Sequence, residues 1–477
     1  MSNTFYWFDY ETTGIDTARD RPLQFAGVRT DMDLNPVGEP LSVYCRLSED
    51  ILPHPESCLI TGITPQLALE RGVAEAEFAR RVHVELSQTG TCAAGYNSIR
   101  FDDEVTRYLL YRNFYDPYER EYKNGNSRWD IIDMVRMCYA LRPEGIEWPK
   151  HEDGSPSFKL EHLSQANCIK HEAAHDALSD VYATLGMARL VKERQPRLYE
   201  YLFNLRQKQE VAKLLNVRER QALLHTSSMF PSASGCTTVV LPLALHPTNR
   251  NGIVVYDLRH PPDDLLSLNA EQLRERIFTR TEELPEGVER VHLKTVHINK
   301  SPALAPLGTL TEAAAERIAI DLGKIKVHMD QLRNVNLDRK IHDALMQEHT
   351  GGGMDPELNL YGGFFGDGDR ARMQAIREAA PQELATRHFA FDDARLPELL
   401  FRYRARNFPE TLAAEEWRRW QQYRRERLTN PEAGGSITLQ EFNRRLQDLG
   451  SNPELDERAM QILEDLAEYA SMLESFD

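Results

Sequence analysis

The chain has 477 residues, more than one hydrophobic core usually organises, so two or three domains are expected. With 41% apolar and 27% charged residues and no apolar run of membrane-spanning length, its composition is that of a globular protein and excludes disordered and membrane-embedded classes. The formal net charge of −17 disfavours a protein that binds nucleic acid over its whole surface, because phosphate contacts come from Lys and Arg.

The N-terminal part has the pattern of one α/β domain. Residues 4–8 (TFYWF) are β-branched and aromatic and predict a buried strand that runs into Asp9. A second strand is expected near Cys92 (TCAAGYN), and the apolar spacing from His175 to Arg194 predicts a helix. Alternating strands and helices are typical of an α/β fold. A basic helical connector follows, since residues 194–220 hold seven Lys/Arg against three Glu.

The rest of the chain predicts a β-rich domain and then helices. Between residues 235 and 306 the apolar period shifts towards two, in segments such as GIVVYDL and VERVHLKTVHI. Three glycines at 351–353 interrupt the chain, and later patterns such as LPELLFRYRARNF have helical spacing. Residues 402–427 hold eight Arg against four Glu, which is compatible with a local basic surface on an acidic protein. We therefore expect domains at residues 1–193, 194–350 and 351–477.

Acidic residues in three segments are candidate metal ligands. Asp9 and Glu11 end the first predicted strand, and they point to the same face because strand side chains alternate. Two neighbouring carboxylates are unfavourable unless a cation neutralises them. Taken alone, the pair is a weak signal, since a solvated strand end is about ten times more common than a metal site.

The other two segments are also ambiguous when each is taken alone. Asp102 (in NSIRFD) opens a helical stretch, where a carboxylate also serves to favour the helix N-terminus, and the adjacent Asp103 suits that role as well. In HDALSD, five residues of helix would place His175 and Asp180 about 140° apart, near enough to border one site. For this segment a capped helix with a surface histidine is the slightly favoured alternative.

Together the three segments predict a two-metal phosphodiesterase site. Asp9, Glu11, Asp102 and Asp180 supply four hard oxygen ligands of the kind that Mg²⁺ prefers, with Mn²⁺ as a substitute. Two such ions about 4 Å apart stabilise the attacking and leaving oxygens of an in-line phosphoryl displacement. His175 would take the proton from the attacking water, a role that suits histidine near neutral pH.

In this order the motifs DxETTG, Nx3FD and Hx4D resemble those of the DEDDh exonuclease superfamily. Longer segments resemble the bacterial exonuclease I family specifically and extend over nearly the whole chain, among them LITGITPQ, GYNSIRFDDEVTR, SFKLEHL, HDALSDVYAT, NKSPALAP, NLYGGFF and YRARNFPETL. The resemblance implies an α/β multidomain fold with a ribonuclease-H-like exonuclease domain, an SH3-like β-barrel domain and a helical C-terminal domain. It also implies a 3′→5′ exonuclease that degrades single-stranded DNA to 5′-mononucleotides in repair and recombination.

Residues 107–129 interleave basic and aromatic side chains, the mixture with which single-strand binders contact phosphates and bases. Tyr108, Tyr111 and Phe114 have helical spacing and are expected in the core, whereas Tyr118 and Tyr122 lie in a polar segment that contains proline. The resemblance implies a longer series of substrate contacts: Thr12, Arg107, Tyr118, Tyr122, Arg136, Lys159, Lys208, Asn251 and Lys294.

The resemblance also implies a protein partner, the C-terminal tail of the single-stranded DNA-binding protein. An acidic tail with an apolar end needs a cation beside an apolar pocket, and Arg142 and Tyr201 match such positions. A turn arginine and a half-buried helix tyrosine are equally good interpretations of these two residues. We expect a monomer with reduced thiols in the cytoplasm, because the six cysteines form no CxxC pair and the N-terminus lacks an export signal.

Two other functions are compatible with the sequence. A DEDDh exonuclease that acts on RNA or short oligonucleotides would carry the same motifs, since discrimination of the 2′-hydroxyl depends on details of the pocket. The two additional domains favour a long single strand instead. A non-catalytic single-strand-binding protein on the same fold is the second alternative, and the complete set of five predicted catalytic residues argues against it.

Overall fold

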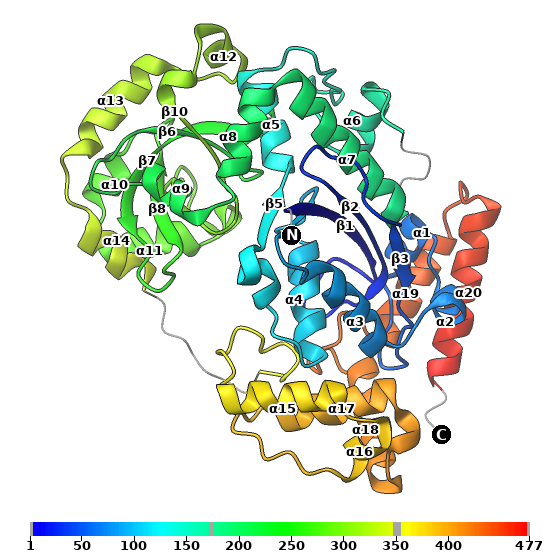
Figure 1. The fold of residues 1–477 in the computed structure, drawn as a ribbon. Helices are drawn as coiled ribbons and strands as arrows, with labels where there is room; N and C mark the ends of the chain where they lie inside the picture. The colour runs from blue at the N-terminus through cyan, green and yellow to red at the C-terminus, as the bar shows by residue number, and fades with distance from the viewer. Residues whose placement is uncertain (1–2, 171–175, 347–353, 475–477) are drawn as a thin grey trace. The chain divides into compact units, whose positions relative to one another are not determined.

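A computed structural model describes residues 3–170, 176–346 and 354–474 (Figure 1). The chain forms two compact units, each assembled from separate stretches of sequence. The first unit comprises residues 1–127, 172–182 and 351–477, and the second comprises residues 128–171 and 183–350. Every helix in the described part of the chain is too short or too polar to span a membrane.

A sheet organises the first unit. Within this unit its strands lie in the order β3-β2-β1-β4, and β1 pairs antiparallel with β2 and parallel with β4. The predicted strands at residues 4–8 and near Cys92 are confirmed as parts of β1 and β4. The bounds of the four strands are β1 (Thr4–Thr12), β2 (Pro22–Thr30), β3 (Leu41–Tyr44) and β4 (Thr91–Gly95).

The core of the first unit covers one face of this sheet. Tyr6, Phe8 and Tyr10 of β1 pack with Phe25 and with apolar side chains of helices α3 (Glu75–Leu86) and α4 (Asp102–Arg112). Each fully buried ring of this kind stabilises the fold by roughly 1.5–3 kcal/mol. Because strand side chains alternate, the odd-numbered residues of β1 lie on the opposite face from this core.

Helices from the end of the chain complete the first unit, which confirms the predicted helical C-terminal region (yellow to red in Figure 1). Tyr108, Tyr111 and Phe114 are buried against side chains of α15 and α17, as their spacing predicted. The helices of this part are α15 (Asp367–Glu378), α16 (Pro381–Thr386), α17 (Leu396–Asn407), α18 (Ala414–Thr429), α19 (Leu439–Gly450) and α20 (Glu457–Glu474). The N-terminal stretch adds α1 (Pro55–Thr61) and α2 (Pro65–Arg71) to the same unit.

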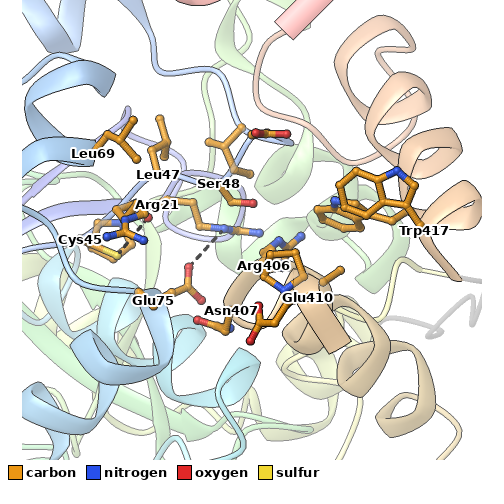
Figure 2. A pocket seen from close by; sticks show the side chains of 18 residues that line it. Arg21, Cys45, Leu47, Ser48, Leu69, Glu75, Arg406, Asn407, Glu410 and Trp417 are labelled. Carbon is orange, nitrogen blue, oxygen red and sulfur yellow. Dashed lines mark hydrogen bonds and ion pairs between the residues drawn. The ribbon is translucent and has the colours of Figure 1, made fainter. Parts of the chain in front are cut away.

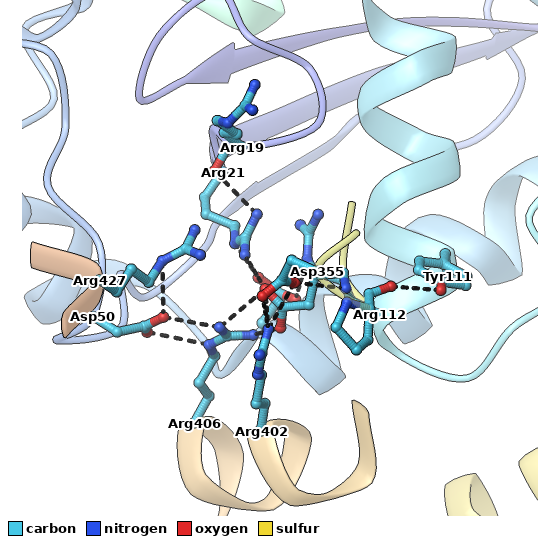
Figure 3. Close-up of polar contacts among 12 residues, drawn as sticks. Arg19, Arg21, Asp50, Tyr111, Arg112, Asp355, Arg402, Arg406 and Arg427 are labelled. Carbon is cyan, nitrogen blue, oxygen red and sulfur yellow. Dashed lines mark hydrogen bonds and ion pairs between the residues drawn. The ribbon is translucent and has the colours of Figure 1, made fainter. Parts of the chain in front are cut away.

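A buried ion-pair network joins the two ends of the chain within the first unit (Figure 3). Arg406 of α17 binds both carboxylate oxygens of Asp50, at 2.8 and 3.1 Å, and also pairs with Glu357. Arg21 pairs with the same Glu357 at 2.9 Å. Buried charges are stable when they are paired in this way, and removing one partner leaves an uncompensated charge.

This network changes the interpretation of the arginine-rich segment at residues 402–427. Arg402, Arg404, Arg424 and Arg427 are buried, and the side chain of Arg406 is 5% exposed. Most of the positive charge counted in this segment therefore neutralises carboxylates inside the unit. The composition left a local basic surface possible, but a charge count carries no information on burial, and five of the eight arginine side chains of this segment are buried.

A cavity of about 360 Å³ lies beside the network (Figure 2). Its walls come from the regions around β2, β3, α17 and α18, and they include apolar as well as charged side chains. The charged lining residues balance one another: Arg21, Arg46, Arg406, Glu49, Glu75 and Glu410. Because the lining is neutral and two of its arginines already bind carboxylates, the cavity gives no preference for an anion.

A second sheet organises the second unit and confirms the predicted β-rich region. Its strands lie in the order β10-β6-β7-β8-β9, and the neighbouring strands pair antiparallel. Residues 128–130 of β5 (Ser127–Asp130) also belong to this unit. The other strands are β6 (Leu223–Thr226), β7 (Thr237–Leu245), β8 (Gly252–Asp257), β9 (Leu293–His297) and β10 (Ala303–Pro306).

Helices before, between and after these strands belong to the same unit (Figure 1). α8 and α9 confirm the predicted helical connector, and α7 begins in the first unit and continues into the second. The helices are α5 (Ile132–Leu141), α6 (Leu160–Ala166), α7 (Ala177–Arg194), α8 (Pro196–Asn204), α9 (Lys208–Leu214), α10 (Asp263–Ser267), α11 (Ala270–Phe278), α12 (Glu312–Arg317), α13 (Leu322–Arg333) and α14 (Asp338–Leu345).

Candidate active site

The carboxylates of Asp9, Glu11 and Asp180 converge in the first unit. Strand β1 presents Asp9 and Glu11 on the face that lies away from the aromatic core, and Asp180 lies in the first turn of α7. One carboxylate oxygen of each residue lies within 4.8 Å of the other two. The structure therefore brings together three of the four predicted metal ligands in one small cluster.

Asp102, the fourth predicted ligand, borders this cluster as the first residue of α4. Its Oδ1 accepts a hydrogen bond from the backbone amide of Tyr10 at 3.1 Å, which ties the start of α4 to β1 between Asp9 and Glu11. The neighbouring Asp103 is buried and forms an ion pair with the buried guanidinium of Arg120. Two adjacent aspartates thus have different surroundings, and Asp102 is the one beside the cluster.

Burial and mutual repulsion raise the pKa values of Asp9 and Glu11. Burial raises the pKa of Asp9 well above its ordinary value, and the charges of Asp102, Glu11 and Asp180 raise it further. Burial, with Asp180 and Asp102 as its strongest charged neighbours, raises the pKa of Glu11 from 4.5 to about 9. A divalent cation would reverse this effect, because it favours the ionised carboxylates. The donor set fits a hard metal ion with oxygen ligands.

The predicted base, His175, lies outside the described residues. Asp176, which follows it, accepts hydrogen bonds from the Gln24 side chain at 3.1 Å and from the backbone amide of Ser179 at 3.3 Å. The second bond satisfies one of the free amides at the N-terminus of α7, as a helix cap does. Asp176 therefore anchors the start of the helix that carries Asp180.

The loop after β1 is held by its own hydrogen bonds. The hydroxyl of Thr12, a predicted substrate contact, donates to the carbonyl of Gly14 at 2.7 Å, and Thr13 donates to Asp20 at 3.0 Å. In the same loop the Ile15 side chain is 91% exposed. Sequence reasoning missed Ile15, because a single apolar residue in a turn carries no motif.

Arg107, a predicted phosphate contact, is buried and paired. Its guanidinium binds Glu104 at 2.6 Å and Glu121 at 2.7 Å, and it lies 5.3 Å from the ring centroid of Tyr118. A guanidinium that holds two carboxylates has few donors left for a phosphate. Its evident structural effect is to fix the ring of Tyr118.

Exposed aromatic side chains surround Tyr118 in the first unit. Tyr118 contacts the ring of Phe364 edge to face, with 5.6 Å between the ring centroids. Tyr361 accepts a hydrogen bond from Arg107 at 3.2 Å and donates one to Glu104. Phe364 is 79% exposed, Tyr122 66% and Tyr361 59%. Tyr361 and Phe364 were missed from the sequence, although their segment, NLYGGFF, carried part of the family resemblance.

The remaining predicted substrate contacts belong to the second unit. Lys159, just before α6, and Lys208, the first residue of α9, are exposed. Asn251 directly precedes β8 and is partly buried. Exposed lysines at such positions are free to reach a phosphate.

Two further cations of the second unit are packed on aromatic rings. Arg136 forms an ion pair with Asp133 at 2.7 Å and lies 5.9 Å from the ring centroid of Phe158. The Nζ atom of Lys294 on β9 lies 4.4 Å from the ring centroid of Phe230. Stacking on a ring orders a cation without neutralising its charge.

A cavity of about 460 Å³ in the second unit brings Arg142 and Tyr201 together. The hydroxyl of Tyr201 is buried and has no hydrogen-bond partner among the described residues, and burial raises the pKa of Tyr201 to about 12. Arg142 donates to the backbone carbonyls of Leu141 and Thr309. The apolar part of the lining is formed by Leu141, Pro196, Leu198, Ala305 and Pro306. An apolar ligand that carries a carboxylate would satisfy both polar groups.

Known proteins are similar to this chain over nearly its whole length. Residues 6–186 match the family model described as Exonuclease, residues 206–348 the Exonuclease I SH3-like domain, and residues 354–473 the Exonuclease I C-terminal domain. Exodeoxyribonuclease I of Haemophilus influenzae is 45% identical over 473 residues, 98% of either chain. These matches confirm the predicted fold class, with an exonuclease domain, an SH3-like domain and a helical C-terminal domain.

Solved structures are similar to the chain over the same length. The structure of an exonuclease I from Methylocaldum szegediense has a TM-score of 0.95 at 55% identity and covers 99% of this chain and 100% of its own. Escherichia coli exonuclease I in complex with a dA16 oligonucleotide has a TM-score of 0.94 at 45% identity, with the same coverage.

Proposed function

Because the chain belongs to the exonuclease I family and is an exodeoxyribonuclease-type hydrolase, we propose that it degrades single-stranded DNA from the 3′ end to 5′-mononucleotides. The observation that carries the proposal is the convergence of the Asp9, Glu11 and Asp180 carboxylates, with Asp102 at their border. The complex of the E. coli relative with a single-stranded oligonucleotide supports the choice of substrate. We place this activity in DNA repair and recombination, in a cytoplasmic monomer.

We propose that the cluster holds two Mg²⁺ ions, with Mn²⁺ as a substitute. Asp9, Glu11, Asp102 and Asp180 would hold the metal, which when bound activates water and stabilises the charge of an in-line phosphoryl transfer. The chain itself fixes the ligands: the Tyr10 amide orients Asp102, and Asp176 anchors the helix of Asp180. His175 takes the proton of the attacking water.

Exposed aromatic side chains of the first unit are proposed contacts of the single strand, and so are cations of the second unit. Tyr122 and Phe364 offer exposed rings on which bases stack, and Ile15 offers an exposed apolar side chain in the loop after β1. Arg107 acts indirectly, since its ion pairs and its contact with Tyr118 position that ring. The proposed contacts are completed by Thr12, Arg136, Lys159, Lys208, Asn251 and Lys294.

The cavity at Arg142 and Tyr201 is the proposed site for the C-terminal tail of the single-stranded DNA-binding protein. The terminal carboxylate would accept hydrogen bonds from the Arg142 guanidinium and from the unpaired Tyr201 hydroxyl, and the apolar walls would take the tail's last side chains. We also retain residues 1–193, 194–350 and 351–477 as the proposed domains.

Degradation assays with end-labelled substrates test the activity. We expect Mg²⁺-dependent release of 5′-mononucleotides from single-stranded DNA, much slower release from duplex DNA and from RNA, and none in EDTA. Asp9→Asn should abolish cleavage, whereas Asp448→Asn, a matched change at an exposed carboxylate on α19, should not. Comparable rates on RNA would favour the oligoribonucleotide alternative. Cutting of closed single-stranded circles as the main activity would refute the proposal.

Fluorescence anisotropy with a labelled tail peptide tests the partner site. Binding should be micromolar at best, about −8 kcal/mol, and should weaken with salt. Arg142→Ala and Tyr201→Phe should each weaken it, the first by about tenfold or more, and leave cleavage of bare single strands unchanged. Arg333→Ala, at an exposed arginine of the same unit, is the matched control. Unchanged affinity in both cavity variants would remove this cavity from the proposal.

A further inference from the structure

Two histidines and a carboxylate meet at the edge of the second unit's sheet. Strands β8 and β9 pair with Tyr256 opposite Leu293, so the amide of Asp257 donates to the carbonyl of His292 at 3.0 Å. In the turn after β8, the amide of His260 donates to the carbonyl of Asp257 at 3.3 Å. The strand register and this turn therefore bring His260 and His292 together.

The two imidazole rings are stacked, with 3.3 Å between their centroids and 10° between their planes. Glu289 lies three residues before His292, and its carboxylate is 3.8 Å from Nε2 of that histidine. One ligand atom each of His260, Glu289 and His292 lies within 4.8 Å of the other two. The side chains are partly exposed, so an ion can reach them from solvent.

The other charged side chains beside the rings, Asp257 and Arg259, are paired with each other. Asp257, whose carboxylate is 4.0 Å from His260 Nε2, is engaged by the Arg259 guanidinium at 2.6 Å. The cation of Arg259 is thus already neutralised by its own partner.

We propose that His260, His292 and Glu289 form a binding site for a transition-metal ion of the Zn²⁺ type, separate from the carboxylate cluster. Two imidazole nitrogens and one carboxylate oxygen are ligands that Zn²⁺ takes in tetrahedral geometry, with water in the fourth position. That geometry needs the two nitrogens about 3.4 Å apart, close to the present ring separation. The rings must rotate out of the stack on binding, because lone pairs of parallel rings do not converge.

The ion would stabilise the loop between β8 and β9. Residues 258–292 leave the sheet after β8, form α10 and α11, and return at β9, which is the edge strand of the order β10-β6-β7-β8-β9. His260 lies at the beginning of this connection and His292 at its end. A metal that joins the two closes a long loop at its base and holds the edge strand that carries Lys294.

The two metal sites differ in ligand chemistry, and the difference makes the proposal testable. The carboxylate cluster offers oxygen ligands, which suit Mg²⁺, whereas imidazole favours Zn²⁺ and Co²⁺ over Mg²⁺. The full-length chain with Asp9→Asn and Asp180→Asn serves as the background, so that the catalytic carboxylates do not compete. After chelation and dialysis, Zn²⁺ is titrated by calorimetry, and Co²⁺ by visible absorption.

We expect the background protein to bind one Zn²⁺ at this site, to show the absorption of tetrahedral Co²⁺, and to unfold at a higher temperature with Zn²⁺ but not with Mg²⁺. His260→Gln and His292→Gln should abolish all three effects. His342→Gln, at an exposed imidazole of α14 beside Asp343, is the matched control and should keep them.

Glu289→Gln separates ligand loss from misfolding, because its carboxylate is 81% exposed and lies outside the ring stack. It should weaken Zn²⁺ binding and leave the unfolding temperature of the metal-free protein unchanged. The proposal is overturned if the background binds no Zn²⁺ at the site, or if the His260 and His292 variants bind it as the background does. Unchanged affinity in Glu289→Gln would overturn the three-ligand site.

Discussion

Replacing Glu11 by glutamine should stabilise the metal-free protein and remove its response to Mg²⁺. In the folded chain the buried cluster raises the pKa of Glu11 from 4.5 to about 9. At intermediate pH the folded chain therefore holds a proton that the unfolded chain releases. The resulting cost in stability is absent below about pH 4.5, grows as the pH rises, and is complete above about pH 9.

The size of the effect follows from the same pKa values. At pH 7.5 the solution lies three pH units above the ordinary pKa of Glu11, 4.5, and 1.36 kcal/mol per unit gives about 4 kcal/mol. Glutamine has nearly the same shape and no charge at any pH, so Glu11→Gln should recover free energy of this order. The gain should shrink towards zero as the pH falls to 4.5.

Thermal unfolding in EDTA and in excess Mg²⁺, at pH 5.5 and pH 8, measures both effects. Without metal, the variant should unfold several degrees above the wild type at pH 8, and the difference at pH 5.5 should be about a third as large. Mg²⁺ should raise the unfolding temperature of the wild type and have little effect on the variant. Glu70→Gln, the same change at an exposed position of α2, should alter neither. A destabilised variant, or one with an undiminished Mg²⁺ response, would refute the electrostatic reasoning.

Asp103→Asn should cost about 3–5 kcal/mol in thermal unfolding, because it removes the nearest carboxylate from the buried guanidinium of Arg120, and should retain Mg²⁺ affinity. Asp102→Asn should abolish cleavage instead. If Asp103→Asn abolished cleavage and Asp102→Asn did not, Asp103 would be the metal ligand. Phe364→Ala should weaken oligonucleotide binding in EDTA by about 1–3 kcal/mol by anisotropy, and unchanged affinity would remove that ring from the strand's path. His175→Ala should lower turnover roughly 10²- to 10⁴-fold and Asp176→Ala much less; equal losses would contradict the assignment of the base.

The features that the sequence predicted correctly depend on residues close together in the chain. Alternation along a strand was sufficient to place Asp9 and Glu11 on one face, and the structure bears this out. Helical spacing was sufficient to assign Tyr108 and Tyr111 to the core. The approach of Asp180 to the strand depends on contacts across about 170 residues, and only the joint occurrence of three motifs indicated it.

The unpredicted part depends on long-range contacts. Arg107 has the residue type of a phosphate contact, but its pairing with Glu104 and Glu121 becomes visible only in the fold. Tyr361 joins the same group from a segment more than 250 residues away. The burial of most arginines of residues 402–427 was not predictable, because composition does not record which carboxylates, such as Asp50, fold against them.

The ion pairs between the two ends of the chain affect how the protein folds during translation. Arg21 and Asp50 pair with Glu357 and Arg406, which the ribosome synthesises last. The residues between 127 and 351 alone take roughly ten to forty-five seconds to translate. During this interval the nascent strand that carries Asp9 lacks the helices that complete its unit. A chain cut short by a premature stop codon should therefore be a substrate for cellular proteases and should not act as an unregulated nuclease.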